Sequence, residues 1–353
     1  MRFVCLVFFD MKKHINIPIF IPHLGCPNQC VFCNQRTISG VEKFDISHVR
    51  NEIESALLTT DPSQEVEIAF FGGSFTGIDR NLMIELLQLA HEYIKSGQVH
   101  SIRCSTRPDY INAEILDILE KYSVKTIELG LQSSSDLVLE RSKRGHTAMD
   151  EANACDLIRE RGFTLVGQMM IGLPGSTIES EMNTARFIID HGASGARIYP
   201  TVVFHGTELC EMAQVGNYTP LNISDAVERA AKVLEMFQDS GIDVIRIGLC
   251  ASENLQDSEK YYAGPNHPAL GELVESAVYY NKIVQILNNS NYYTDSSISV
   301  FVAKGCLSKA IGQKKCNIEN LKRQFGFRDV KIKEDQALSA YEIKIEERKR
   351  ECT

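Results

Sequence analysis

The chain has 353 residues, of which 44% are hydrophobic and 24% charged, and its net charge is −9. This length suits one large α/β domain with a smaller one, and the negative charge excludes a protein that coats nucleic acid over its whole surface. Eleven cysteines in so long a chain predict reduced thiols and one metal cluster rather than a disulfide framework.

The N-terminus begins with a short apolar run, MRFVCLVFFDMKKH. Its lysines follow the run, whereas a secretory signal carries its positive charges first. The run is also far shorter than the ~20 residues that a membrane span needs. We therefore expect a cytoplasmic protein without a membrane partner. Residues 1–14 are predicted to be an edge strand, or an extension before a start at Met11.

Residues 15–250 alternate short runs rich in Val, Ile and Phe with amphipathic helical stretches. Strands that are apolar on both faces, each followed by a helix, are typical of a parallel sheet. Six such units predict an α/β fold, a partial TIM-like (β/α)6 barrel. Loops at the carboxyl ends of the strands carry the chemistry in such barrels, so the polar and glycine-rich loops here are expected to meet at one mouth.

Three cysteines follow the first predicted strand, in HLGCPNQCVFCNQRTISG. Cys26, Cys30 and Cys33 are spaced C-x3-C-x2-C, and no fourth ligand lies at zinc-finger spacing. A cubane iron–sulfur cluster on three cysteines leaves one iron open for a small chelating molecule. Phe32 adds an apolar face beside the cluster. The alternative is a set of buried or redox-active thiols.

This cysteine loop at the end of a first strand resembles that of the radical S-adenosylmethionine (SAM) superfamily. The resemblance implies a partial barrel of the radical SAM type, a 4Fe–4S cluster and SAM bound to the open iron. It also implies an enzyme that cleaves SAM reductively to a deoxyadenosyl radical. The electron would come from an external one-electron reductant of the flavodoxin or ferredoxin type.

Two glycine loops are predicted to contact the cofactor. Gly72 and Gly73 follow the second strand, where glycine lets a backbone approach a ligand closely. In the radical SAM setting they resemble the loop that holds the amino group of SAM, although most glycine pairs are plain turns. Gly172 begins a Gly-Leu-Pro-Gly turn before a helix, where backbone groups would contact the adenine or ribose.

Three polar residues of the strands and their loops are further candidates for cofactor binding. Arg107 could pair with a carboxylate in a bidentate manner. Glu128 and Gln132 share one face of their strand, and in the barrel interior they would need polar partners such as a ribose or a substrate. The alternative for Arg107 is a buried Arg–Glu pair that only holds the barrel together.

The stretches TRPDY, ELGLQS, KRGHT and ARIYPTVVFHGTEL resemble the radical SAM core of the Elongator catalytic subunit, which modifies wobble uridines of tRNA. This resemblance covers residues 15–250 and places Lys143 or Tyr199 on the substrate side, as catalytic residues. The Elongator subunit has a longer gap between its first two cluster cysteines and carries an acetyltransferase domain, for which this chain has no room. The chain therefore resembles the short bacterial relatives that lack the acetyltransferase domain.

Residues 251–353 are predicted to form a small, basic α+β domain. The segment from Phe301 to Lys333 has nine basic against two acidic residues, so the rest of the chain carries −16. Its helix–loop–helix around Gly312 resembles a KH-type module, in which a G-x-x-G loop clamps RNA. Here Lys315 replaces the second glycine. The predicted partner is tRNA or another RNA, and the alternative is a solvated basic surface.

Three hypotheses follow from the sequence. The first is a radical SAM enzyme that modifies tRNA or another RNA. The second keeps the radical chemistry for a small metabolite or a porphyrin, since oxygen-independent coproporphyrinogen oxidase is a more distant relative with a similar cluster loop. The third is a non-catalytic iron–sulfur protein that binds RNA.

Overall fold

The computed structural model describes residues 14–21, 24–26, 30–33, 44–61, 63–249, 259–290 and 294–348. The predicted N-terminal extension lies outside these ranges except for His14. The predicted boundary between barrel and C-terminal domain, at residues 250 and 251, also lies outside them.

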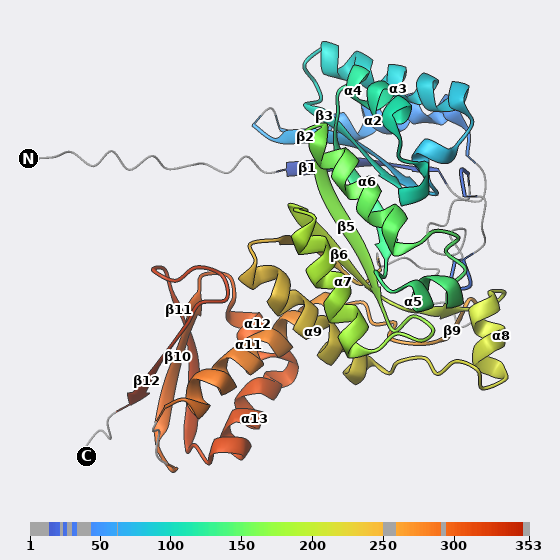
Figure 1. The fold of residues 1–353 in the computed structure, drawn as a ribbon. Coiled ribbons are helices and arrows are strands. Elements are labelled where there is room, and N and C mark those ends of the chain that lie inside the picture. Colours follow the sequence, from blue (N-terminus) through green and yellow to red (C-terminus); the bar gives the residue numbers. More distant parts are fainter. Residues whose placement is uncertain are drawn as a thin grey trace, which may run out of the picture.

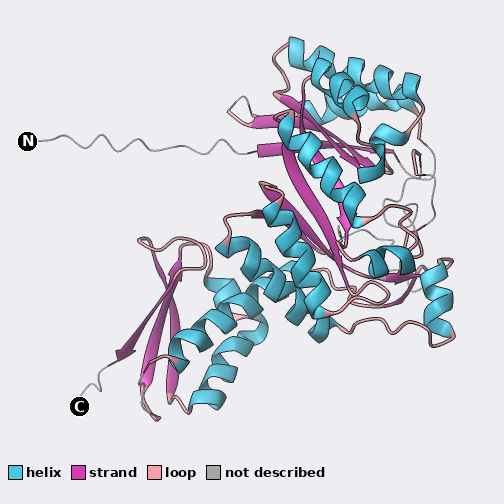
Figure 2. Ribbon diagram, in the orientation of Figure 1, coloured by secondary structure: helices cyan, strands magenta, loops and turns pink. Residues whose placement is uncertain are grey.

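A seven-stranded parallel sheet forms the larger part of the structure. Its strand order is β1-β2-β3-β4-β5-β6-β8, and each neighbouring pair is parallel. The sheet is curled, and helices cover its outer face (Figures 1 and 2). The strands are β1 (His14–Ile21), β2 (Glu65–Gly72), β3 (Ser101–Thr106), β4 (Val124–Gln132), β5 (Thr164–Ile171), β6 (Gly195–Pro200) and β8 (Asp243–Ile247).

The helices that follow the strands begin at polar residues whose side chains cap the first turn. Thr147 and Thr177 each form a capping box, and Asp79 and Asn112 accept backbone N–H groups of α3 and α4. The main helices are α2 (Ile46–Leu57), α3 (Arg80–Lys95), α4 (Ala113–Lys121), α6 (Ala148–Glu160), α7 (Ile178–Asp190) and α9 (Ile223–Asp239). Shorter elements are η1 (Phe75–Gly77), η2 (Pro108–Tyr110), α5 (Asp136–Arg141), α8 (Glu208–Gln214), and the two-stranded pair β7 (Val203–Phe204) and β9 (Tyr261–Ala263).

The two faces of the strands differ in chemistry. Side chains such as Ile68, Ile102 and Leu129 are fully or almost fully buried in the main core. Their neighbours along the strands are polar, as Arg103 and Glu128 show, and point to the opposite, concave face. The helix side therefore supplies the hydrophobic core, and the concave side supplies polar groups for a site.

The α/β fold with a partial barrel is confirmed, and the barrel has one strand more than the six predicted. The additional strand is β8, the last in the sheet. Its residues are exposed or half-buried, and Asp243 and Arg246 interrupt the apolar pattern that identifies a buried strand. An edge strand of five residues carries too weak a sequence signal for prediction.

The C-terminal part contains a second, three-stranded sheet with the order β11-β10-β12. The predicted helix–loop–helix is present as α12 and α13. α11 joins the two parts, because Val274 and Val278 belong to the main core whereas Tyr279 and Ile283 belong to the second core. The elements are α11 (Leu270–Asn288), β10 (Ser297–Ala303), α12 (Leu307–Ile311), η3 (Gln313–Lys315), α13 (Cys316–Phe325), β11 (Asp329–Asp335) and β12 (Ile343–Arg348).

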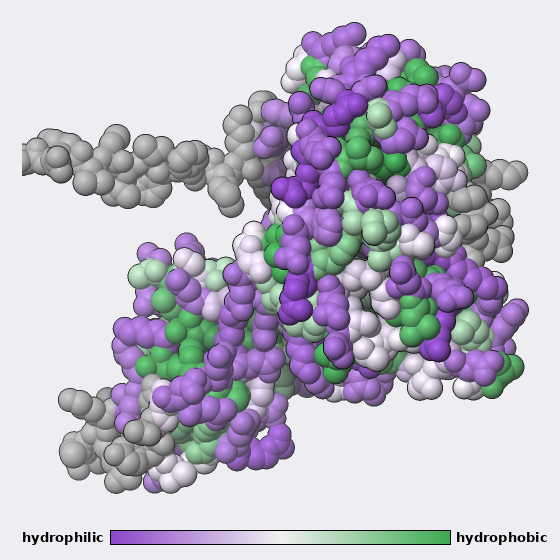
Figure 3. Space-filling model, viewed as in Figure 1, coloured by the Kyte–Doolittle hydropathy of each residue, from purple (hydrophilic) through white to green (hydrophobic). Residues whose placement is uncertain are grey.

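The face of the molecule in Figure 3 is mainly hydrophilic over the barrel helices, and hydrophobic side chains gather over the C-terminal strands. Partly buried residues of these strands, Ile332, Ile343 and Ile345, pack against the second core. Among the helices of the described residues, none combines the length and the apolar character needed to cross a membrane.

Candidate cofactor site at the mouth of the barrel

The cysteine loop and the glycine loop after β2 are in close backbone contact at the carboxyl ends of β1 and β2. The Gly73 N–H donates to the Ile21 carbonyl over 2.9 Å. A Cβ atom on Gly73 would lie 2.1 Å from the Leu24 carbonyl oxygen, and one on Gly25 would lie 2.1 Å from the Ser74 carbonyl oxygen. Both glycines are needed because only a bare backbone fits at this distance. The predicted glycine loop therefore borders the cysteine loop directly.

Backbone hydrogen bonds connect the cysteine loop to the end of α5 and to the first turn of α8. The Val31 N–H donates to the Ser142 carbonyl over 3.2 Å, and the Val31 carbonyl accepts the Leu209 N–H over 2.8 Å. Cys30 is buried, Cys33 is half-buried and Cys26 is exposed, and none of the three forms a disulfide among the described residues. Loops from four separate strands thus meet around these cysteines, as the barrel prediction requires.

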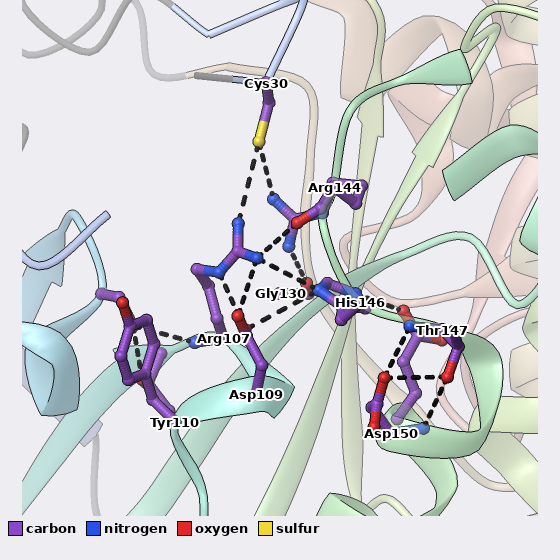
Figure 4. A network of polar contacts seen from close by, with 12 residues as sticks. Cys30, Arg107, Asp109, Tyr110, Gly130, Arg144, His146, Thr147 and Asp150 are labelled. Carbon is purple, nitrogen blue, oxygen red and sulfur yellow. Dashed lines mark hydrogen bonds and ion pairs between the residues drawn. The ribbon is translucent and has the colours of Figure 1, made fainter. Parts of the chain in front are cut away.

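Two arginines direct guanidinium N–H groups at the sulfur of Cys30 (Figure 4). Arg144 Nη1 lies 3.2 Å from Cys30 Sγ, and Arg107 Nη1 lies 4.0 Å from it. Both side chains are buried, with Arg144 5% and Arg107 4% exposed. Two guanidinium groups therefore place positive charge against the Cys30 sulfur.

Arg107 is held by protein groups on its other edges. Its Nε and Nη2 donate to the Asp109 carboxylate over 2.8 Å and 3.0 Å, and Nη2 also contacts the Arg144 carbonyl. A bidentate carboxylate partner for Arg107 is therefore present within the chain. This is a buried pair of the kind that the alternative interpretation describes, with an aspartate in place of its glutamate, and binding of a cofactor carboxylate by Arg107 stays a prediction.

A buried His–Glu pair lies behind Arg107. His146 Nδ1 is 3.4 Å from Arg107 Nη2, and His146 Nε2 is 3.0 Å from Glu151 Oε1. Desolvation, together with the charges of Arg144 and Arg107, lowers the pKa of His146 to about 4. Burial raises the pKa of the fully buried Glu151 well above its usual value. Burial therefore favours the neutral form of both members of this pair.

Below the mouth, Glu128 is the centre of an ion-pair ladder across the concave face. Its two oxygens accept N–H groups of Arg103, Arg197 and Gln168 over 2.8–3.0 Å. Arg103 also pairs with Glu67 over 2.8 Å. Because both oxygens of Glu128 already have partners, its predicted contact with a cofactor stays a prediction without further support here.

Gln132 is the other polar residue predicted for this face. It lies at the end of β4 with a φ of +72°, directly after a shift in the β4–β5 register. Its Oε1 atom is buried and has no hydrogen-bond partner among the described residues. Gln132 thus keeps an acceptor available at the mouth.

The remaining candidates lie around the same rim. The Gly172 N–H donates to Glu181 Oε1 over 2.8 Å, so this amide is already engaged. Phe32 packs on a small apolar cluster that includes Val31 and Val203. Tyr199 is half-buried on β6 next to Arg197, and desolvation raises the pKa of its hydroxyl.

Lys143 is the second residue predicted for the substrate side. Its Nζ pairs with Glu208 over 2.6 Å, and its side chain is 59% exposed. Lys143 has a φ of +52°, which is uncommon for a residue with a side chain. The structure places it at the outer rim, where a role toward a substrate stays a prediction.

The residues around the cysteines suit an anionic iron–sulfur cluster in their chemistry. The three cysteine sulfurs supply the donors, and Arg144 contacts Cys30 Sγ. Three buried polar atoms of the β4 end and the loop that follows α5 lack hydrogen-bond partners among the described residues, namely Gln132 Oε1, Ser142 Oγ and Arg144 Nε. Within the described residues, no three His, Cys, Asp or Glu side chains converge as metal ligands. Binding of a cluster therefore requires the thiols to draw together, and residues 27–29 between them lie outside the described ranges.

Two sets of residues were missed as site components in the sequence. Arg144 was noted only as part of the KRGHT stretch, and its contact with Cys30 is the main finding at the mouth. The Glu67–Arg103–Glu128–Arg197 ladder was also missed. Alternate polar positions in β2, β3, β4 and β6 were the available signal, since period-two polarity marks the concave face.

Comparison with known families decides the assignment. The family described as the Radical SAM superfamily matches residues 20–188, and the Radical SAM C-terminal domain matches residues 193–280. The chain belongs to the radical SAM superfamily of enzymes. This confirms the resemblance that the cysteine spacing and the strand–helix order indicated.

Three relatives are 26–30% identical to this chain over the aligned residues. An uncharacterized protein of Methanocaldococcus jannaschii is 29% identical, over 64% of this chain and 72% of its own length. The tRNA uridine(34) acetyltransferase of the same archaeon is 30% identical over 55% of this chain, and human Elongator complex protein 3 is 26% identical over 61%. The chain covers only 37% and 47% of the lengths of these two relatives.

The fold of this radical SAM chain is similar to that of a solved archaeal relative. The structure of Elp3 from Methanocaldococcus infernus, with an N-terminal deletion, superposes with a TM-score of 0.62 at 22% identity. The match covers 76% of this chain and 63% of that chain. At this identity the comparison establishes the shared fold alone.

Proposed function

We propose that this radical SAM enzyme holds a 4Fe–4S cluster on Cys26, Cys30 and Cys33 and cleaves SAM reductively to modify RNA, in the first place tRNA. The observation that carries the proposal is the contact of Arg144 with Cys30. Arg144 is 5% exposed, and its guanidinium donates to Cys30 Sγ and to the Gly130 carbonyl. Among the described residues, no carboxylate forms an ion pair with it.

A buried guanidinium without a counter-charge is costly, since even a paired buried ion retains a desolvation penalty of several kcal/mol. The anion that Arg144 needs must therefore come from the place at which it points. Cluster thiolates at the cysteine loop provide that charge. A set of neutral, metal-free thiols would leave Arg144 uncompensated.

Several residues of the mouth are placed to hold SAM beside the cysteines. The backbone of Gly72 and Gly73 borders the cysteine loop, and Gln132 Oε1 offers a free acceptor. Phe32 would form the apolar side of the site. Cys26, Cys30 and Cys33 would hold the cluster, which would supply the electron for reductive cleavage of SAM to methionine and a deoxyadenosyl radical. Lys143 and Tyr199 remain our candidates for the substrate side.

An RNA substrate is supported by the relatives and by the basic C-terminal region. The named relatives include tRNA uridine(34) acetyltransferases, which are 30% and 27% identical to this chain over 203 and 199 residues. Lys314 and Lys315 are exposed at the N-terminal end of α13, and phosphates are attracted to such lysines. In this proposal the barrel, residues 15–250, carries the chemistry, and residues 251–353 contact RNA in the cytoplasm.

Two assays on the anaerobically reconstituted chain test the proposal. With dithionite as reductant, we expect cluster-loaded protein to release deoxyadenosine from SAM. Nucleoside mass spectrometry of tRNA from cells with and without the protein should then show a modified nucleoside that depends on it. Release of deoxyadenosine with unchanged tRNA would favour a small metabolite or porphyrin substrate. Loaded protein that releases no deoxyadenosine would reject radical chemistry.

A further inference from the structure

Arg144 leaves one positive charge uncompensated at the cysteine loop. Two arginines face Cys30, but Asp109 pairs with Arg107 through two hydrogen bonds and cancels its charge. Behind them, Glu151 contacts His146 over 3.0 Å, and among the described residues no carboxylate forms an ion pair with Arg144. In the described part of the chain, Arg144 therefore acts on the Cys30 sulfur as a net positive charge at 3.2 Å.

We propose that Arg144 is a positioning residue that sets the reduction potential of the cluster. The proposal rests on the cluster of the proposed function. Reduction adds one electron from an external one-electron donor and breaks no bond, so the reduced cluster is more negative by one charge. A buried cation beside a ligating sulfur stabilises the more negative state and makes the cluster easier to reduce.

The fork of the guanidinium explains why an arginine serves this purpose. Arg144 Nη2 donates to the Gly130 carbonyl at the end of β4 while Nη1 donates to Cys30 Sγ. One planar group thus fixes the distance between the strand and the sulfur. The Arg144 carbonyl also receives Arg107 Nη2, which couples the two arginines.

Asp109 has the opposite expected effect, which gives the proposal a second test. Its carboxylate cancels the charge of Arg107, whose Nη1 lies 4.0 Å from Cys30 Sγ. With an uncharged residue at position 109, the positive charge of Arg107 would no longer be cancelled and would act on the cluster. The side chain of Asp109 is 26% exposed, so the substitution is tolerable for folding.

The test is a redox titration of the reconstituted full chain, followed by EPR of the reduced cluster. In Arg144→Met we expect the ratio of reduced to oxidised cluster at a fixed potential to fall at least tenfold, which is a shift of about 59 mV for a one-electron couple. In Asp109→Asn the ratio should rise. Arg144→Lys should lie between Arg144→Met and wild type. Arg186→Met removes an exposed arginine on α7 and should leave the ratio within twofold.

The outcomes separate this inference from the proposed function. A ratio in Arg144→Met within twofold of wild type, at equal iron content, would overturn the role of Arg144. If Arg144→Met retains no cluster, Arg144→Lys decides, and a ratio there equal to or above that of wild type would overturn the role. A wild-type chain that binds no cluster would instead reject the proposed function itself.

Discussion

Arg144 Nη1 lies 3.2 Å from Cys30 Sγ, although the two residues are 114 positions apart in the chain. Cys30 belongs to the loop after β1, and Arg144 belongs to the loop between α5 and α6. Their contact ties the fourth strand–helix unit to the cysteine loop. It makes Cys30 the best-defined of the three predicted cluster ligands.

Substitution of Cys30 tests the ligand assignment. In Cys30→Ser we expect the iron content of reconstituted protein to fall at least tenfold, because a hydroxyl is a poor replacement for a thiolate ligand. Iron and sulfide analysis with the visible absorption spectrum measures this loss. Cys26→Ser and Cys33→Ser should behave alike.

Cys155 on α6 provides the matched control. It is fully buried in the main core, and burial raises the pKa of its thiol to about 12, so it is inert as a ligand. Cys155→Ala should cost about 1 kcal/mol of stability and leave the iron content unchanged. Equal iron loss in both variants would contradict the assignment.

The ion-pair ladder predicts a large stability cost at Glu128. In Glu128→Gln, Arg103 and Arg197 lose their shared buried counter-charge, and we expect the free energy of unfolding to fall by about 3–5 kcal/mol. Urea unfolding followed by circular dichroism measures this change. Glu114→Gln breaks only the exposed pair with Arg80 and should cost at most about 1 kcal/mol. If both variants lost equally little free energy of unfolding, the ion-pair ladder would contribute little to stability.

Glu151 predicts a pH dependence of stability. Burial holds the pKa of the folded carboxyl well above 4.5, so the folded state keeps a proton that the unfolded state releases. The contribution of Glu151 to stability therefore declines as pH rises above about 4.5, by up to about 1.4 kcal/mol per pH unit until the folded pKa is reached. Glu151→Gln cannot ionise and should escape this decline.

Unfolding of both proteins at about pH 5 and about pH 8 measures the Glu151 effect. The free energy of unfolding of Glu151→Gln minus that of wild type should be larger at the higher pH. The lowered pKa of His146 acts in the opposite sense, between about 4 and 6.5, and is present in both proteins. A difference independent of pH would mean that Glu151 titrates as an exposed carboxyl does.

The lysines before α13 predict the mode of RNA contact. Lys314 and Lys315 are exposed and adopt left-handed backbone angles, with φ of 52° and 63°. Their joint substitution by alanine should weaken tRNA binding. The slope of log K against log salt concentration should also become shallower, by about 0.7–0.9 for each phosphate contact that is lost. Filter binding at several salt concentrations measures both effects. As a control, alanines at Lys121 and Lys125, which are exposed on the barrel, should change neither the affinity nor the salt dependence. If this control weakened tRNA binding as much as the alanines at Lys314 and Lys315, the attraction would be unspecific.

Most of the barrel could be predicted from the sequence because its strands are buried on the helix side and each precedes an amphipathic helix. The succession of strands and helices along the chain follows from that pattern, and it places the cysteine loop and the glycine loop at the ends of the first two strands. β8 escaped prediction because Asp243 and Arg246 interrupt a five-residue edge strand. The short helices α5 and α8 were missed because two turns carry little periodicity.

The partners within the site were less predictable than the elements. Glu128 meets Arg103 and Arg197 across 25 and 69 positions, and only the pairing of strands brings them together. The Arg107–Asp109 pair is local and depends on the turn η2, so the TRPDY stretch held that signal. The contact of Arg144 with Cys30 depends on how two loops fold over the mouth, which sequence periodicity does not describe.

The most direct test of the account is anaerobic analysis of the wild-type chain for iron, sulfide and SAM cleavage. The account predicts four irons and four sulfides per chain when fully loaded, and deoxyadenosine that forms only with SAM and dithionite. Zinc in the cysteine loop, or a full cluster that leaves SAM intact under reduction, would contradict it.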